Sequence, residues 1–275
     1  MTGILGEVEF EEIRRRVGDA IEGIRREFQR LVDNANRVLD WLPGFIVDRV
    51  MAALRTVGEI IGKVITEVIK FQSQPGRPWT LWTTGGTWTD AVGAKTSSWS
   101  ESFSVGSMRT DDEWSGSAAE AYKNVLPSQQ KALGAVKAAC DEVDDLLGKL
   151  AIAIGVAWLA VVSALVTFVI ELTAEATAAA ATGGAGAPPA AAAAGGSAVK
   201  VAALVTAALG ALEAFVGSTL LPSIKDLNQR VQNNEGFPRK HGSDEAGWPQ
   251  LTKDISNSSH RQNKGAHAPW EMTDA

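Results

Sequence analysis

The feature that most constrains this chain is a run of 21 residues without a charged side chain, Leu150–Ile170. At about 1.5 Å per residue, a helix of this length would cross a bilayer hydrocarbon core about 30 Å thick. The apolar character extends further, because residues 150–224 contain only four charges: Glu171, Glu175, Lys200 and Glu213. This region therefore predicts apolar helices that are buried either in lipid or against other parts of a protein.

An Ala/Gly/Pro-rich linker, 176–197, is expected to separate this first apolar helix from a second one at about 198–224. Together they predict an apolar helical hairpin. Two arrangements stay open. The hairpin either spans a membrane, where Glu213 would be costly unless paired or neutralised, or it forms the core of a soluble bundle with the preceding helices.

The N-terminal region predicts an amphipathic hairpin. Residues 7–42 carry an apolar stripe at spacings of three and four, as in a coiled coil. Pro43-Gly44 ends this helix, because proline cannot donate within it and glycine favours a cap or turn. The pattern resumes over 46–68. An antiparallel pair is favoured, and a kinked continuous rod is the alternative.

Residues 72–87 are expected to be a loop, because two prolines and Gly85-Gly86 interrupt regular helix. In a third helix after this loop, Trp88, Trp99 and Phe103 can share one face. We interpret this aromatic face as packing surface, with a partner-binding groove as the functional alternative.

A fourth helix is expected from about 117 to 149, with a kink at Pro127. It follows the triplet Trp114-Ser115-Gly116, a W-x-G turn between two amphipathic helices. Glycine permits a tight corner, a serine can cap the next helix, and the indole ring can cover the corner.

The helix after this corner opens with two small residues and an aromatic one, Ala118, Ala119 and Tyr122. In this combination the chain resembles the WXG100/ESAT-6-like superfamily, and more closely the larger actinobacterial ESX (type VII) secretion-associated proteins. The likeness covers residues 79–149 well and the apolar hairpin only by composition, whereas residues 7–71 lie outside the minimal W-x-G unit. It implies export as a folded helical hairpin, often together with a helical partner.

The same resemblance implies a secretion signal of the form Tyr-x-x-x-Asp/Glu after the second helix of the W-x-G hairpin. The chain departs from this pattern, because its only tyrosine, Tyr122, is followed four residues later by Leu126. Trp270 and Asp274 have an aromatic-x-x-x-acid spacing and are the candidate replacement; a spacing of four places both side chains on one helical face. Otherwise a partner supplies the signal, or the protein is not secreted.

Other functional classes find little support in the composition. The net charge of −6 gives no basic field for nucleic acid. We expect no cofactor and no metal site, because the three histidines lie in a polar tail without cysteine or carboxylate ligands at suitable spacing. The N-terminus lacks a Sec-type signal pattern. The single cysteine, Cys140, is interpreted as a small buried apolar residue.

Catalytic motifs are also absent from the sequence: there is no HExxH, GxSxG, Walker loop or CxxC. We therefore expect a non-enzymatic protein.

These observations predict an all-α fold of elongated hairpins or a bundle, with four consecutive segments. They are an amphipathic hairpin (1–72), a W-x-G hairpin (73–149), an apolar hairpin (150–235) and a disordered tail (236–275).

The expected function is that of a type VII secretion substrate or secretion-associated protein, secreted or bound to the cell envelope. Its expected partners are a helical protein or a second copy, the ESX machinery and a membrane. The alternative is a membrane-permeabilising toxin or toxin-delivery module.

Overall fold

The computed structural model of the chain describes residues 5–38, 42–107, 116–182, 185–232, 237, 247–249, 261–262 and 271–272. Apart from one short antiparallel ladder, β1 (Arg261–Gln262) with β2 (Glu271–Met272), the regular elements described are helices. The predicted all-α class is thus confirmed. The chain divides into two compact units: unit 1 is Met1–Leu81 with Lys149–Thr219, and unit 2 is Trp82–Gly148 with Leu220–Ala275.

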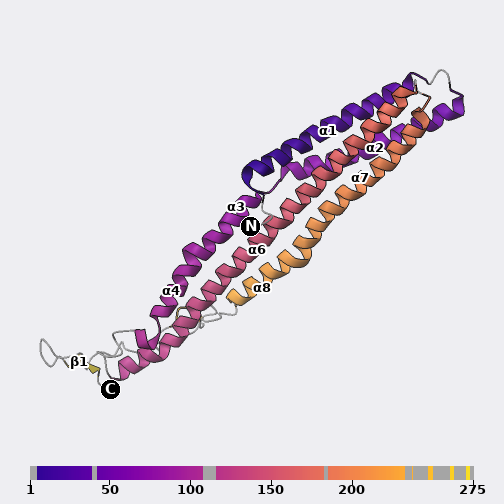
Figure 1. Cartoon of the computed structure of the whole chain (residues 1–275). Coiled ribbons are helices and arrows are strands. Elements are labelled where there is room, and N and C mark those ends of the chain that lie inside the picture. The colour runs from indigo at the N-terminus through magenta and orange to yellow at the C-terminus, as the bar shows by residue number, and fades with distance from the viewer. Residues whose placement is uncertain are drawn as a thin grey trace. The chain divides into compact units, whose positions relative to one another are not determined.

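Unit 1 contains the N-terminal amphipathic hairpin, formed by α1 (Glu7–Asn36) and α2 (Gly44–Ser73) (Figure 1). Gln72 near the end of α2 donates to the carbonyl of Arg14 near the start of α1. Closer to the hairpin's turn, a Cβ at Gly58 would lie 3.4 Å from the ring of Phe28. These contacts run in opposite directions along the two helices, so the antiparallel hairpin is confirmed and the kinked rod is wrong.

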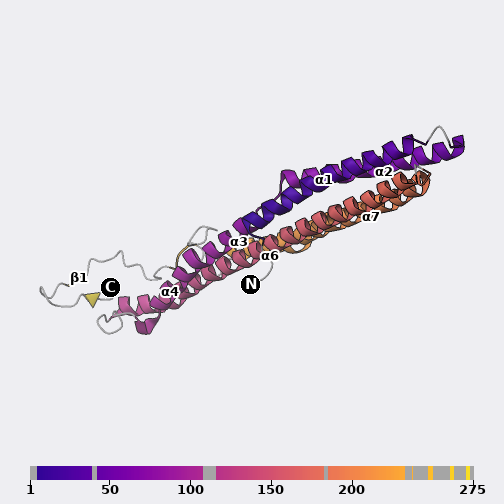
Figure 2. The same cartoon turned by 45° about the horizontal axis from the view of Figure 1, so that its top comes forward.

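The second hairpin of unit 1 consists of the C-terminal part of α6 (Ser117–Ala181) and of α7 (Ala187–Phe215). Figures 1 and 2 show these two helices side by side. The apolar stripes of α1 and α2 meet α6 and α7 in one core. Its fully buried members include Val17, Leu31, Val57, Val68 and Leu165.

Two predicted boundaries in the apolar region are wrong. The expected change of helix at 149/150 is absent, since α6 continues through it for 65 residues with Pro127 inside. The expected linker 176–197 is mostly helical, because alanine is the best helix former and the prolines at the start of α7 occupy positions without an intrahelical N–H bond. Only a short turn remains, in which the Gly186 amide donates to Thr182 Oγ1 at 2.7 Å.

The loop predicted over 72–87 is also largely helical, since α3 spans Pro78–Thr87. Pro78 stands at its first position, where a missing N–H costs no hydrogen bond. Gly85 is accommodated by tertiary packing. A Cβ there would collide with the Asp144 carboxylate and lie 3.2 Å from the backbone of α6. Glycine thus allows a close approach of two helices, which local propensity cannot indicate.

In unit 2, a series of short helices runs antiparallel to the N-terminal half of α6. The series continues from α3 into the π-helix η2 (Trp88–Gly93), α4 (Ala94–Ser102) and the 3₁₀ turn η3 (Val105–Ser107). Thr89 Oγ1 donates to Asp144 at 3.0 Å, and Ser100 Oγ donates to the Gln130 carbonyl at 3.3 Å. A second π-helix, η4 (Val216–Leu220), leads into α8 (Leu221–Gln232), whose residues belong to unit 2.

The structure groups the chain differently from the four consecutive segments 1–72, 73–149, 150–235 and 236–275. Each compact unit combines two separated stretches, because α6 contributes its two halves to different units. Most of the tail lies outside the described residues. Among those described, Pro249 is buried and accepts a hydrogen bond from Gln129 Nε2 at 3.0 Å.

Candidate functional site

The apolar hairpin of unit 1 is covered on one face by the amphipathic hairpin. Trp158, Val161, Leu165, Phe168 and Leu172 of α6 are buried in the common core. The cover is tightest at Gly23 of α1, where a Cβ would lie 3.2 Å from the methyl groups of Val169. Buried Asn34 donates to the carbonyl of Ala176 at 3.0 Å and holds α1 against the end of α6.

An aromatic cluster closes the other end of this interface. Trp158 is fully buried, and its ring lies 4.6 Å from that of Phe71 and 5.3 Å from that of Phe10. Phe10 in turn contacts Trp79 at 5.2 Å. The Trp158 indole N–H donates to the carbonyl of Pro75 at 2.9 Å, which satisfies its one polar group inside the core.

The opposite face of α6 is open and apolar. Its exposed large side chains are Ile152, Val156, Leu159, Val166 and Ile170, at helical spacings that form a single stripe. Val156 is 60% and Ile170 is 64% exposed. A contiguous apolar stripe of this kind marks a surface for a membrane or a protein partner.

Helix α7 is more open than α6. Its buried residues lie along one edge, mainly alanines with Val201 and Val205, whereas Val199 and Leu204 are exposed. In the helical stretch Ala187–Arg230, which continues from α7 beyond Phe215, 11% of the most apolar 18 residues are buried, compared with 44% in Ala119–Ala181 of α6. By length and composition alone, these two described helices could cross a bilayer.

Three of the four charged residues in the apolar region lie close together between α6 and α7. Lys200 pairs with Glu171 at 2.6 Å, and Ser197 Oγ donates to Glu175 Oε1 at 2.9 Å. The second carboxylate oxygen of Glu175 is buried and accepts no hydrogen bond within the described structure. The stripe from Ile152 to Ile170 contains no charged residue of α6, and Arg15, Arg16 and Asp19 of α1 border its end at Val166 and Ile170.

The predicted W-x-G corner is described only in part. Trp114 and Ser115 lie outside the described residues, as does the side chain of Ala118. Gly116 is exposed with φ +105°, a conformation that glycine adopts without strain, and its carbonyl accepts from the Glu120 amide in the first turn of α6.

In the helix that follows this corner, Ala119 is fully buried and Tyr122 is half-buried. Trp270 and Asp274, the candidate signal, lie outside the described residues.

The three residues of the predicted aromatic face have different neighbours. Trp88 in η2 lines a pocket against α6 and α8, and Trp99 in α4 is 55% exposed. Phe103 packs against Trp248 of the tail, with ring centroids 6.0 Å apart. Trp88 is itself 46% exposed, whereas Phe103 is half-buried, so the choice between packing surface and partner-binding groove stays a prediction.

The described part of the chain contains no group of three or more His, Cys, Asp or Glu side chains that could hold a metal ion. Cys140 is buried, in agreement with its interpretation as a small apolar residue. Burial raises the pKa of the Cys140 thiol above its usual value, with a smaller contribution from Asp141.

Trp158 and Asn34 are the interface residues that sequence reasoning missed. A tryptophan inside an uncharged run was a usable signal for Trp158, because a buried indole N–H needs an acceptor. Asn34 gave no such signal, since a single amide on a charged helix is ordinary.

No family model, curated protein or solved structure matches this chain.

Proposed function

We propose that the chain is a type VII (ESX) secretion substrate or secretion-associated protein that acts through helix–helix and membrane contacts, without catalysis. The observation that carries the proposal is the one-sided burial of the apolar hairpin. Its inner face is packed against α1 and α2, while the stripe from Ile152 to Ile170 remains open. A stripe without charge suits a lipid surface better than the polar face of a soluble partner.

The assignment to type VII secretion is supported by the sequence around Gly116. Helix α6 begins directly after this glycine, and the segment α3–α4 runs antiparallel to it. The family resemblance implies an antiparallel helical pair, so this arrangement supports the proposal. A helical protein or a second copy is the expected partner, and Trp99 offers it an exposed aromatic side chain.

Export is tested in the native cells with and without the ESX ATPase. We expect the protein in the culture medium or cell envelope only when the ATPase is present. Trp114→Ala and the pair Trp270→Ala/Asp274→Ala should each reduce export, whereas Trp82→Ala, at a 49% exposed position outside these motifs, serves as the matched tryptophan control. Unchanged export without the ATPase would reject the type VII assignment.

Membrane contact is tested separately with the purified full chain and liposomes of neutral phosphatidylcholine. We expect co-flotation with the vesicles, and its loss in Val156→Glu/Ile170→Glu, because two charges would enter the apolar stripe. Val8→Glu is the control, since Val8 is an 84% exposed apolar residue on charged α1. Equal flotation of all three proteins would contradict a role for the stripe.

The openness of α7 favours one second function, a membrane-permeabilising module whose hairpin leaves its cover and inserts. A disulfide can distinguish the two functions. The Cβ position at Gly23 lies 3.9 Å from Val169 Cβ, within the range for a disulfide. In a Cys140→Ser background, Gly23→Cys/Val169→Cys would lock α1 onto α6.

Dye release from liposomes that stops on oxidation and returns on reduction would support insertion. If the oxidised protein still floats with the vesicles but neither form releases dye, surface contact is the function. Each single-cysteine variant in the same background is the control for oxidation.

A further inference from the structure

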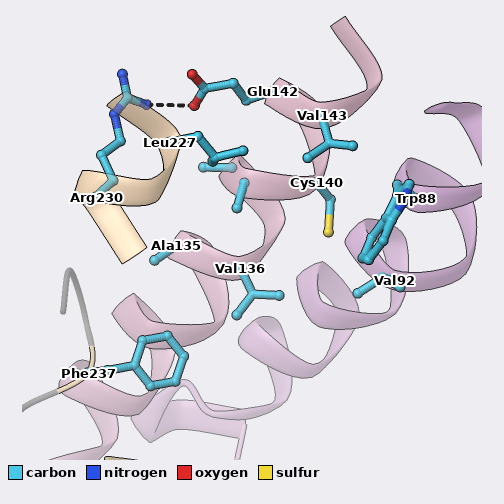
Figure 3. A pocket seen from close by; sticks show the side chains of 12 residues that line it. Trp88, Val92, Ala135, Val136, Cys140, Glu142, Val143, Leu227, Arg230 and Phe237 are labelled. Carbon is cyan, nitrogen blue, oxygen red and sulfur yellow. Dashed lines mark hydrogen bonds and ion pairs between the residues drawn. The ribbon is translucent and has the colours of Figure 1, made fainter. Parts of the chain in front are cut away.

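Unit 2 contains a pocket of about 440 Å³ that the proposed function does not use. Figure 3 shows side chains from three helices and from the tail around it. Ten of its twelve lining residues are apolar and two are charged. The lining consists of Trp88, Val92, Ala135, Val136, Ala138, Ala139, Cys140, Glu142, Val143, Leu227, Arg230 and Phe237.

The pocket is large enough for a small molecule and has the composition of a ligand site. Such sites range from about 300 to 1,000 Å³ and combine apolar walls with a few polar groups that orient the ligand. The α6 wall extends from Ala135 to Val143, about 12 Å along the helix at 1.5 Å per residue. A long apolar wall made of alanines and valines fits a single hydrocarbon chain.

The floor of the pocket results from a close approach of η2 to α6. A Cβ at Gly93 would lie 3.4 Å from the Cβ of Cys140, so the two helices nearly touch there. The wider turn of the π-helix carries Trp88 and Val92 on the pocket side of this contact. Because burial keeps the Cys140 thiol protonated, the floor is apolar and uncharged.

One edge of the pocket is polar but carries no net charge. Arg230 of α8 donates to Glu142 of α6 at 3.0 Å, as the dashed line in Figure 3 marks. Nearby on α6, Asp141 is paired with Lys137, and Asp144 accepts from Thr89. An anionic ligand group would have to displace Glu142 from Arg230, and a cationic one would have to displace Arg230 from Glu142. An uncharged hydroxyl or ester group can hydrogen-bond to the ion pair without breaking it.

We propose that unit 2 binds a neutral single-chain amphiphile in this pocket, with the hydrocarbon chain along α6 and the uncharged head group at the Glu142–Arg230 pair. The source is either a lipid breakdown product or a free neutral amphiphile, since both have the same chemistry. The proposal does not depend on export or on membrane contact by unit 1.

The test uses the full chain and the neutral fluorescent probe N-phenyl-1-naphthylamine, displaced by ligands with one ten-carbon chain. We expect monodecanoylglycerol to displace the probe at least tenfold more effectively than decanoate or decyltrimethylammonium, all below their micelle concentrations. Equal or better displacement by either charged ligand would overturn the head-group assignment. Absence of probe binding would overturn the site.

Two variants locate the bound probe. Ala139→Phe fills the pocket and should weaken probe binding at least tenfold, whereas Ala180→Phe, at an exposed position of α6 in unit 1, should leave it unchanged. Val156→Glu/Ile170→Glu should also bind normally. Loss of probe binding in this last variant would place the probe on the apolar stripe and contradict the proposal.

The only cysteine of the chain provides a second readout that needs no variant. Monodecanoylglycerol should slow the reaction of Cys140 with methyl methanethiosulfonate at least threefold, because the chain would cover the floor. An unchanged reaction rate at saturating ligand would contradict the proposed position of the chain, even if Ala139→Phe failed to fold.

Discussion

The two halves of α6 differ in what they pack against. In unit 1, its residues beyond Lys149 pack with aromatic and branched aliphatic side chains around Trp158 in a shared buried core. In unit 2, the residues before Lys149 contact α3 and η2 through glycines. Gly85 faces Asp144, Gly93 faces Cys140, and a pocket remains beside them.

This difference shows how one continuous helix can serve two tasks. Large side chains that fill the space between helices give a stable cover for an apolar hairpin. Glycine contacts bring two backbones close together, and in unit 2 a pocket lies beside them. The stability of unit 1 is therefore expected to fall most when a buried side chain is shortened. The stability of unit 2 is expected to fall when a side chain is enlarged.

The largest effect is expected for Trp158→Ala. It removes the centre of the aromatic cluster and leaves a cavity, for which losses of about 3–5 kcal/mol are typical. Urea denaturation followed by circular dichroism measures it. Trp99→Ala, at a 55% exposed position in unit 2, should change the free energy of unfolding by less than about 0.5 kcal/mol. A loss of free energy of unfolding below about 1 kcal/mol for Trp158→Ala would contradict the central place of Trp158 in the buried core.

The second prediction concerns two neighbouring glycines of α3. Gly85→Ala places a methyl group against Asp144 and should destabilise unit 2 by about 1–3 kcal/mol. Gly86→Ala meets no atom within 4 Å and should be neutral or stabilising by up to about 1 kcal/mol. Hydrogen exchange resolves the two units, and faster exchange confined to unit 2 is expected for Gly85→Ala. Equal behaviour of both variants would refute the close helix contact.

A smaller effect is expected at the hydrogen bond between Asn34 and the Ala176 carbonyl. Asn34→Ala removes a buried donor and should lower the free energy of unfolding of unit 1 by about 1–2 kcal/mol. Gln29→Ala removes an exposed bond to Asp33 on the same helix and should cost no more than about 0.5 kcal/mol. Urea denaturation measures both losses in free energy of unfolding. Equal losses for the two variants would contradict the role of Asn34 in holding α1 against α6.

The smallest effect is expected at the surface of α1. The hydrogen bond from Arg15 lowers the pKa of Glu12, so this interaction stabilises α1 above the usual pKa of the carboxyl group and is lost as the pH falls through its lowered pKa. Arg15→Ala should lower the melting temperature slightly at pH 7 and leave it unchanged once the carboxylates are protonated. Arg25→Ala, also on the exposed side of α1, is the control. A larger decrease in melting temperature at acid pH than at pH 7 would contradict the lowered pKa of Glu12.

The two N-terminal amphipathic helices could be predicted from sequence because their evidence is local. The stripe from Ile13 to Leu31 and that from Val50 to Val68 have the helical period, and Pro43-Gly44 separates them. The helical character of 78–87 and 176–197 was missed for opposite reasons. Gly85 was interpreted as a helix breaker although it is a packing residue, and the alanines were interpreted as a linker despite their helix propensity.

The candidate sites were less predictable. The apolar pocket brings together Trp88, Cys140, Arg230 and Phe237, which are up to 149 positions apart in the chain and share no motif. The Gly23–Val169 contact likewise joins the charged helix α1 to the uncharged stretch of α6. Such contacts depend on how the helices pack, because helix periodicity defines an apolar face but not its partner.

The sequence by itself determined that the chain is helical, that its N-terminal helices are amphipathic, and that residues 150–224 are strongly apolar. These properties depend on side chains within one or two helical turns of each other. Only the tertiary structure decided that one face of the apolar hairpin is buried by α1 and α2 while the stripe from Ile152 to Ile170 stays open. Protein and lipid interiors are equally apolar, so hydrophobicity alone cannot distinguish the two faces.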